Sequence, residues 1–429
     1  MRKLSICLIT VVALLAACQP TVRKKNLNDL ATDYVRLGLE IGKYDPVFVD
    51  AYYGPDSLAY TGEVTDSFPK ERFREKVASL KAELETLANA PAATKEEAMR
   101  ANWISSQLTA FDRRIRIFAE DYGTFDEEAE ELFGVKIPTY DSTHFIKLIE
   151  KLDRILPGTG DITERVKILT GKFIIPEDRL DTVFQVAIHE ARRITSEKFD
   201  MPKEETFTLE YVQDKVWGGY NWYQGNYNSL IQINTDNPLG IDRAIDLACH
   251  EGYPGHHVYN MMLEKNLYNE KGWVEISLYP LFSPQSLIAE GSANYGIEMA
   301  FPEEEYDKFA TEVLMPLAGL DTAGASVYFE YIDLREKLNY ARNEAARGII
   351  NGTMSESEID HWLEDFALTT TSRPFIKQNR TYIVNYNYGK DMVKAYIESQ
   401  SETLEDRWKP LGVLLSSPVT PKEMLPEME

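Results

Sequence analysis

Cysteine is scarce in this chain, since only Cys7, Cys18 and Cys249 occur among 429 residues. Three cysteines cannot form a disulfide framework, so we expect a hydrophobic core to hold the fold together. Positive charge is also scarce, because 46 Lys and Arg stand against 69 Asp and Glu and leave a formal charge of −23. A protein of this charge would be repelled by nucleic acid and by anionic membrane surfaces. We therefore expect no nucleic-acid partner.

The apolar run at the N-terminus is too short to span a bilayer. It follows a short basic region, Arg2 and Lys3, and ends in Leu15-Ala16-Ala17-Cys18. This ending resembles a lipobox, in which the signal is cut before the cysteine and the cysteine then carries a lipid. It predicts an exported lipoprotein of the periplasm or outer membrane, held at the membrane only through Cys18. The alternative is a general secretory signal with a coincidental cysteine.

The chain then divides into a signal peptide at 1–17, a lipidated tether at 18–26 and a domain at 27–429. No low-complexity tract or Pro/Gly/Ser-rich linker interrupts the last part, so we expect a single domain. This domain can be bilobal, with a helical lobe at 27–200 and a second lobe at 201–429 that holds the motifs described below.

Apolar residues recur at helical spacing over much of the domain, and two short segments alternate as strands do. The predicted helices cover 27–43, 69–88, 94–121, 180–198, 241–250, 322–350 and 381–400. The predicted strands cover 206–212 and 227–235. This pattern predicts a mainly α protein with a small antiparallel β-sheet.

Histidine is also rare, but its distribution is informative. Three of the six histidines lie in the segment His250-Glu251-Gly252-Tyr253-Pro254-Gly255-His256-His257. Imidazole nitrogens bind zinc, and a carboxylate beside them can take a proton from a zinc-activated water. We therefore expect one zinc ion here, with Glu251 as general base. Cys249 precedes His250, but helix neighbours point about 100° apart, so we expect it to be a small buried apolar residue.

The histidine spacing departs from the short zinc-protease motif, in which two histidines lie four residues apart on one helix. Here the second histidine follows at six residues (His256) or seven (His257). Seven residues of regular helix would separate the side chains by about 10.5 Å along the axis, too far to share an ion. Pro254-Gly255 can force a bulge that absorbs the extra residues. Two extra residues are absorbed more easily than three, which favours His256, and His257 stays open as the alternative.

A third protein ligand is expected for a catalytic zinc. The candidate is Glu290, in a predicted helix whose small residues Gly291, Ser292 and Ala293 permit close packing. Asn294 lies one turn further on the same face, where it can hydrogen-bond a metal ligand. By contrast, His189 begins a similar His-Glu pair, but Arg193 stands where a second ligand would be needed, so an ordinary amphipathic helix is expected there.

The segments 250–257 and 290–295 resemble the two signature motifs of the bacterial domain-of-unknown-function family 885, which is grouped with the gluzincin metallopeptidases. Segments 217–225 and 44–55 resemble a shorter subgroup of it, so the resemblance covers most of the mature chain. It implies a zincin-like fold with His250, His256 or His257, and Glu290 as ligands and Glu251 as base.

The resemblance weakens toward the C-terminus. Arg342 matches an arginine that the family often has on a long helix, but the Asp and His expected after it are replaced by Ala346 and Ile350. Tyr386 and Gly389 match a closing Tyr-x-x-Gly element. A phenol near the zinc can hydrogen-bond the oxyanion formed during attack, so Tyr386 is the second catalytic candidate, with a packed aromatic as the alternative.

These features predict a zinc-dependent peptidase that acts on a peptide or a small amide. The strand 227–235 precedes the metal segment and is expected to be an edge strand that holds an extended substrate. The aromatic segment 217–227 would form walls of the site or, alternatively, part of the core. Two other functions use the same residues: hydrolysis of a non-peptide amide or ester, and non-catalytic binding of a metal or ligand by a surface lipoprotein. Retention of Glu251 argues against the last, because binding alone needs no base.

Overall fold

The structure is a computed structural model that describes residues 25–215, 217–369 and 372–425. The predicted signal peptide and Cys18 lie outside the described residues. The chain is mainly helical, as predicted, and its buried side chains form one continuous core. Within the described part, no helix has both the length and the apolar character needed to cross a membrane.

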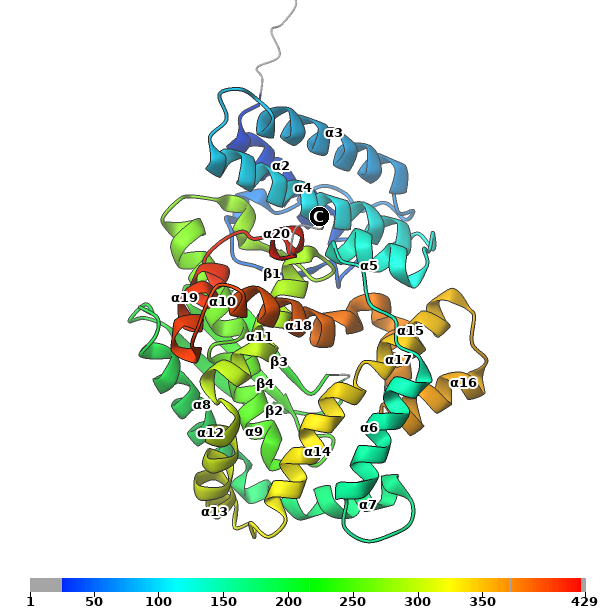
Figure 1. The fold of residues 1–429 in the computed structure, drawn as a ribbon. Helices are drawn as coiled ribbons and strands as arrows, with labels where there is room; N and C mark the ends of the chain where they lie inside the picture. Colours follow the sequence, from blue (N-terminus) through cyan, green and yellow to red (C-terminus); the bar gives the residue numbers. More distant parts are fainter. Residues whose placement is uncertain (1–24, 216, 370–371, 426–429) are drawn as a thin grey trace, which may run out of the picture.

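Three helices pack together at the N-terminal end of the molecule (top of Figure 1). They are α2 (Leu27–Ile41), α3 (Lys70–Ala88) and α4 (Lys95–Phe118), and their bounds agree with the predicted helices. Asn26 and Thr94 form capping boxes that satisfy free amides at the starts of α2 and α4. The next helices are α5 (Phe125–Phe133), α6 (Ser142–Ile155), α7 (Ile162–Thr170) and α8 (Leu180–Ser196).

Two small sheets lie in the molecule. The larger contains β2 (Thr206–Val212), β3 (Gly219–Gly225) and β4 (Asn228–Asn234) in the order β2-β4-β3. Antiparallel pairing is found between β3 and β4 and between β1 (Val49–Tyr52) and β5 (Leu278–Pro280), whereas β2 runs parallel to β4. The edge-strand prediction for 227–235 is wrong, because β4 is central and hydrogen-bonded on both sides. The edge strand next to the metal segment is β3.

Strand β3 was not predicted, because its glycines and tyrosines have no strong strand pattern as a group. The alternation is nevertheless present, since Asn221 and Tyr223 are buried and Trp222 between them is exposed. Asn226 and Tyr227 then both adopt positive φ, of 53° and 58°, and make the tight turn that returns the chain as β4.

The second half consists of helices around a central one, α11 (Pro284–Ala300), which is buried on nearly every side. The elements that contribute to the site are α9 (Ile241–Leu247), α10 (His256–Leu263), α14 (Ala325–Leu338), α15 (Ala341–Asn351) and α18 (Val384–Glu398). The predicted helix 322–350 is therefore two helices, which meet at Asn339 and Tyr340. The others are α12 (Glu303–Phe309), α13 (Met315–Ala318), α16 (Glu356–Asp360), α17 (Ser372–Asn379), α19 (Leu404–Leu415) and α20 (Pro421–Met424).

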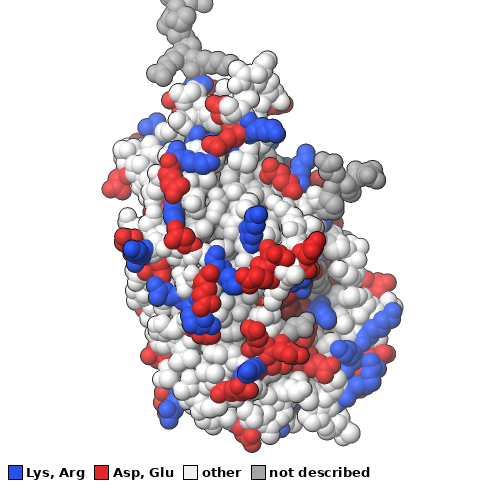
Figure 2. Space-filling model, turned by 60° about the vertical axis from the view of Figure 1, so that its left-hand side comes forward, with Lys and Arg blue, Asp and Glu red and all other residues white. Residues whose placement is uncertain are grey.

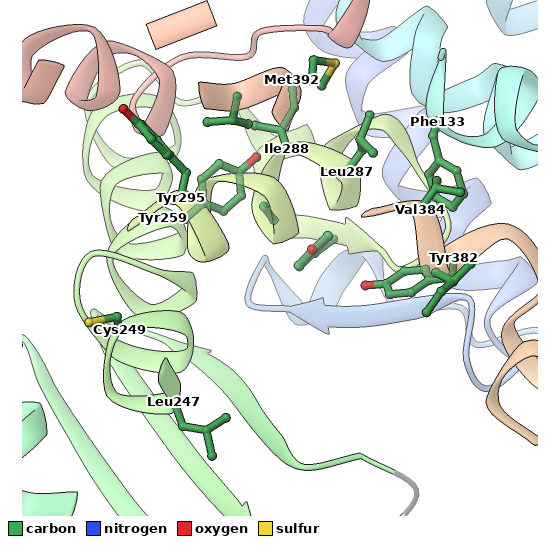
Figure 3. Close-up of a cluster of buried hydrophobic side chains, with 14 of the residues drawn as sticks. Phe133, Leu247, Cys249, Tyr259, Leu287, Ile288, Tyr295, Tyr382, Val384 and Met392 are labelled. Carbon is green, nitrogen blue, oxygen red and sulfur yellow. The ribbon is translucent and has the colours of Figure 1, made fainter. Parts of the chain in front are cut away.

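Figure 3 shows the core around α11, where apolar side chains such as Leu287 and Ile288 meet others from α10 and α18. Cys249 is fully buried and unpaired, so the prediction of a buried apolar residue is confirmed. Helices α11 and α18 approach closely at two glycines. A Cβ atom on Gly291 would lie 2.4 Å from the carbonyl oxygen of Gly389, a distance that real atoms do not adopt.

This contact predicts the effect of a single methyl group. We expect Gly291→Ala to separate α11 from α18 and to lower the free energy of unfolding by about 1–3 kcal/mol, the usual cost of overpacking. Urea unfolding followed by circular dichroism measures the change. Gly171→Ala is the matched control, because its Cβ would meet no atom within 4 Å, and it should not destabilise the protein. Equal stability of the two variants would contradict the close-approach argument.

Candidate metal centre

The helix that carries His250 widens and then stops before His256. Residues Ala248–Gly252 form a π-helical turn, and the amide of Tyr253 donates to the carbonyl of Ala248, five residues back, at 3.0 Å. The helix is then interrupted at Tyr253, cis Pro254 and Gly255, and α10 begins at His256. The expected bulge at Pro254-Gly255 is therefore a π turn followed by a break between two helices.

Gly255 is the point of closest approach in this break. Its amide donates to the carbonyl of Cys249 at 2.9 Å. A Cβ atom here would lie 2.0 Å from the carbonyl oxygen of His250 and 2.3 Å from that of Cys249. Both neighbours are backbone atoms that cannot move aside, so only glycine fits. Because the start of α10 packs directly on this backbone, the side chain of His256 lies next to that of His250.

The result is a compact group formed by His250, His256 and Glu290. The two imidazole Nε2 atoms lie 3.1 Å apart, and Glu290 Oε2 lies 3.2 Å from that of His250 and 3.6 Å from that of His256. Ligand atoms that surround zinc tetrahedrally at about 2.0–2.1 Å lie about 3.3 Å from one another. The three atoms therefore have the spacing that one zinc ion requires.

Two further observations fit a cation at this point. Glu290 Oε1 accepts a hydrogen bond from the Tyr382 hydroxyl at 2.9 Å, whereas Oε2 is buried and lacks a hydrogen-bond partner. A buried carboxylate oxygen without a partner is costly unless a cation compensates it. In addition, Glu251 and Asp50 lie close enough to interact electrostatically with the group. Although burial opposes it, Glu290 and these two carboxylates raise the pKa of His256 to about 9.

Asn294 orients the first histidine. Its side-chain oxygen lies 3.1 Å from His250 Nδ1, and its amide nitrogen donates to the carbonyl of Tyr386 at 3.2 Å. Since the amide group is oriented by the second bond, its oxygen accepts a hydrogen bond from Nδ1–H, which leaves the lone pair of Nε2 directed at the group. Asn294 was expected to play this part from its position one turn after Glu290.

His257 points away from the group, so it does not join His250 and Glu290. Its ring is fully buried, with Nδ1 2.8 Å from Ser229 Oγ and Nε2 3.0 Å from Glu205 Oε2. Both ring nitrogens are thus engaged. Of the two alternatives for a second ligand, the geometry selects His256 and assigns His257 to a buried hydrogen-bond network.

Glu251 lies at the edge of the metal group. Its Oε1 is 4.0 Å from His250 Nε2, and its backbone carbonyl accepts a bond from Asn221 of β3 at 2.7 Å. Burial raises the pKa of Glu251, as suits a carboxylate that must take up a proton. Gly219 makes room for it, since a Cβ there would lie 2.9 Å from Glu251 Oε1. The glycine at the first position of β3 is therefore explained by the room that Glu251 needs.

Two tyrosines from the C-terminal part flank the group. Tyr386 on α18 is half-buried, and its ring stacks on His250 at a centroid distance of 6.5 Å. Burial raises the pKa of Tyr386 well above its ordinary value, so its hydroxyl stays protonated. Tyr382, which contacts Glu290, was missed. Its position four residues before Tyr386 was the available clue, because such residues share a helix face.

Asp50 and Tyr220 also lie at the site, and neither was predicted individually from the sequence. Asp50 comes from β1 and accepts a hydrogen bond from the hydroxyl of Tyr220 on β3. Burial raises the pKa of Asp50 to about 6, and the bond from Tyr220 opposes this shift. The two residues lie more than 150 positions apart, so no local pattern relates them.

The group faces a cavity of about 2240 Å³. Its lining comes from the π turn, α6, α11, α14, α15, α18 and the residues 217–222 that include the start of β3. By contrast, His189 lies exposed on α8 and bonds the carbonyl of Gln185, as expected for an ordinary helix.

Comparisons with protein-family models, with curated proteins and with solved structures found no match to this chain. The site therefore stands on its own geometry.

Substitutions of His256 and His257 are expected to have opposite outcomes for zinc binding. We expect one zinc ion per chain in the wild-type protein and in His257→Asn, and loss of the ion in His256→Asn, because only His256 faces Glu290. Elemental analysis after gel filtration measures the zinc content per chain. His257→Asn should instead lower stability by about 1–3 kcal/mol, since it removes the buried hydrogen bonds of the imidazole ring with Ser229 and Glu205. Zinc loss in His257→Asn alone would contradict the assignment.

The same network predicts a pH dependence of stability. Burial by itself would raise the pKa of Glu205, but bonds from His257, Tyr253 and Arg192 outweigh it and lower the pKa from 4.5 to about 2. A carboxyl with a lowered folded-state pKa stabilises fully above the unfolded value, and this contribution is lost as the pH falls from 4.5 toward 2. Over this window, wild type should lose about 3 kcal/mol more unfolding free energy than Glu205→Gln. Urea titrations test this, with the exposed neighbour substitution Glu204→Gln expected to follow wild type.

Proposed function

We propose that this chain is a zinc-dependent hydrolase that cleaves peptide bonds. The observation that carries the proposal is the triangle of His250 Nε2, His256 Nε2 and Glu290 Oε2, with Glu251 Oε1 4.0 Å from the nearest of these atoms. Three protein ligands with a carboxylate beside them are the arrangement of catalytic zinc sites, whereas structural sites use four protein ligands.

Zinc held there would act as a Lewis acid and lower the pKa of a water molecule into the neutral range. Glu251 would take the proton from this water and deliver it to the leaving nitrogen. Its raised pKa suits both steps, because the carboxylate must hold the proton between them. Asn221 holds the backbone of Glu251 and Gly219 leaves room for its carboxylate, so the base needs no rearrangement before it acts.

Tyr386 is proposed as the donor to the oxyanion. Its ring lies against His250, its pKa is raised by burial, and its own segment is bonded through Asn294 to the same histidine. A protonated phenol in this position can donate to an oxygen that becomes negative in the transition state. Tyr382 is a positioning residue, because its hydroxyl is already committed to Glu290.

A peptide substrate is supported by the edge strand. In the order β2-β4-β3, strand β3 leaves one edge without a sheet partner among the described residues, and Gly219 to Trp222 line the cavity. An extended peptide can add to such an edge through main-chain hydrogen bonds. A non-peptide amide or ester would gain nothing from this edge, which is why we favour the peptide. The resemblance to family 885 and its zincin-like architecture, and export as a lipoprotein through Cys18, belong to this proposal.

Glu251→Gln tests the function directly. We expect the variant to retain one zinc ion and the wild-type fold but to lose about 10²–10⁴-fold in kcat/KM on a peptide library, because the amide cannot accept the proton. Glu330→Gln removes a partly exposed carboxylate of α14 that lines the same cavity, and this control should keep its activity. Failure of the zinc-loaded wild type to cleave any peptide would refute the peptidase proposal. Cleavage of amide or ester substrates alone would identify the non-peptide hydrolase, and zinc binding without any hydrolysis would identify a binding protein.

A further inference from the structure

Arg342 lies on α15 at the wall of the cavity that contains the metal group. Its helix is joined to α18 by a reciprocal pair of hydrogen bonds, in which the side-chain amides of Asn343 and Asn387 donate to each other at 3.0 Å. Arg342 and Tyr386 are the residues that immediately precede this pair, and they lie close enough to interact electrostatically. The buried amide pair therefore fixes the guanidinium beside the proposed oxyanion donor.

The guanidinium of Arg342 has no anionic partner among the described residues. Its Nη1 donates to the side-chain oxygen of Asn339 at 3.0 Å, and its Nε is buried without a hydrogen-bond partner. Other arginines of the interior are paired, as in Arg100 with Glu275 and Arg114 with Asp45. Burial without a carboxylate lowers the pKa of Arg342 to about 10.

An unpaired arginine is notable because the surroundings are acidic. The chain carries a formal charge of −23, and acidic side chains gather in the lower half of the face shown in Figure 2. The cavity wall itself includes Glu298, Glu330 and Glu336, yet none of them pairs with Arg342. A guanidinium that lines a cavity and has no ionic partner can still offer its two terminal nitrogens as a planar pair of donors that matches a carboxylate.

We propose that Arg342 binds the free α-carboxylate of the substrate, so that the enzyme removes residues from the C-terminal end of peptides. The proposal rests on the proposed function for the scissile bond. The distance from Arg342 to the metal group is short, because Arg342 neighbours Tyr386 and the Tyr386 ring lies 6.5 Å from that of His250. An extended chain advances about 3.3–3.6 Å per residue, so one or two residues fit between the metal group and the carboxylate.

The test measures binding rather than turnover. Zinc-loaded Glu251→Gln protein is titrated by calorimetry with N-acetyl-phenylalanyl-alanine and with the same compound bearing a C-terminal amide. We expect the acid to bind about 10-fold tighter, the effect of a charge-assisted hydrogen bond. Adding Arg342→Met should abolish this preference, and adding Arg342→Lys should keep part of it. Lys337→Met removes an equal charge from the exposed wall of the same cavity and should leave the preference unchanged.

Equal binding of acid and amide, or no binding of either, would overturn the proposal. A preference that survives Arg342→Met would also overturn it, because the carboxylate would then be held by the metal. Circular dichroism melts verify that each variant folds. Hydrolysis by the wild type is measured separately, so an Arg342-dependent preference without any cleavage would support carboxylate binding while refuting the hydrolase.

Discussion

The contact between Gly255 and the backbone of His250 is the constraint on which the site depends. Two histidines six residues apart cannot meet on a regular helix, and the chain brings them together by widening one turn and starting a new helix against the old one. The new helix can start there only because Gly255 has no side chain. Every other feature of the site, from Glu290 to Tyr386, is arranged around the pair that this contact creates.

A buried polar network stabilises this break between the two helices on the side away from the metal group. Glu205 accepts bonds from Tyr253, in the break, and lies 3.0 Å from Nε2 of His257, at the start of α10. Arg192 on α8 supplies its positive partner. The network holds both sides of the break to one carboxylate, so the segment keeps one conformation although it is not a regular helix. His257 thus shapes the site without facing it.

Local sequence patterns predicted many of the helices and the metal segment. Contacts between elements far apart in the sequence could not be predicted from these patterns. The helical spacing identified α2, α3, α4 and α8 closely, because each buries one face in a regular period. The rarity of histidine pointed to the segment 250–257, and one helical turn related Asn294 to Glu290. Asp50 and Tyr220 were not predicted, and Arg342 was named only through the family resemblance, since the proximity of these residues to the site arises from packing between elements far apart in the sequence. The order of the sheet escaped for the same reason, because pairing partners are set by the whole fold.

The proposed metal would also stabilise the fold, since no disulfide occurs in the part of the chain that the structure describes. His256 and Glu290 belong to different helices, and Gly291 next to Glu290 is packed onto α18. An ion bound between them would act as a cross-link that closes the intervening loop and ties α18 to the metal segment. Binding energy spent in this way becomes folding energy. The same ion would then serve catalysis and stabilise the fold. Its loss would destabilise the walls of the cavity as well as abolish activity.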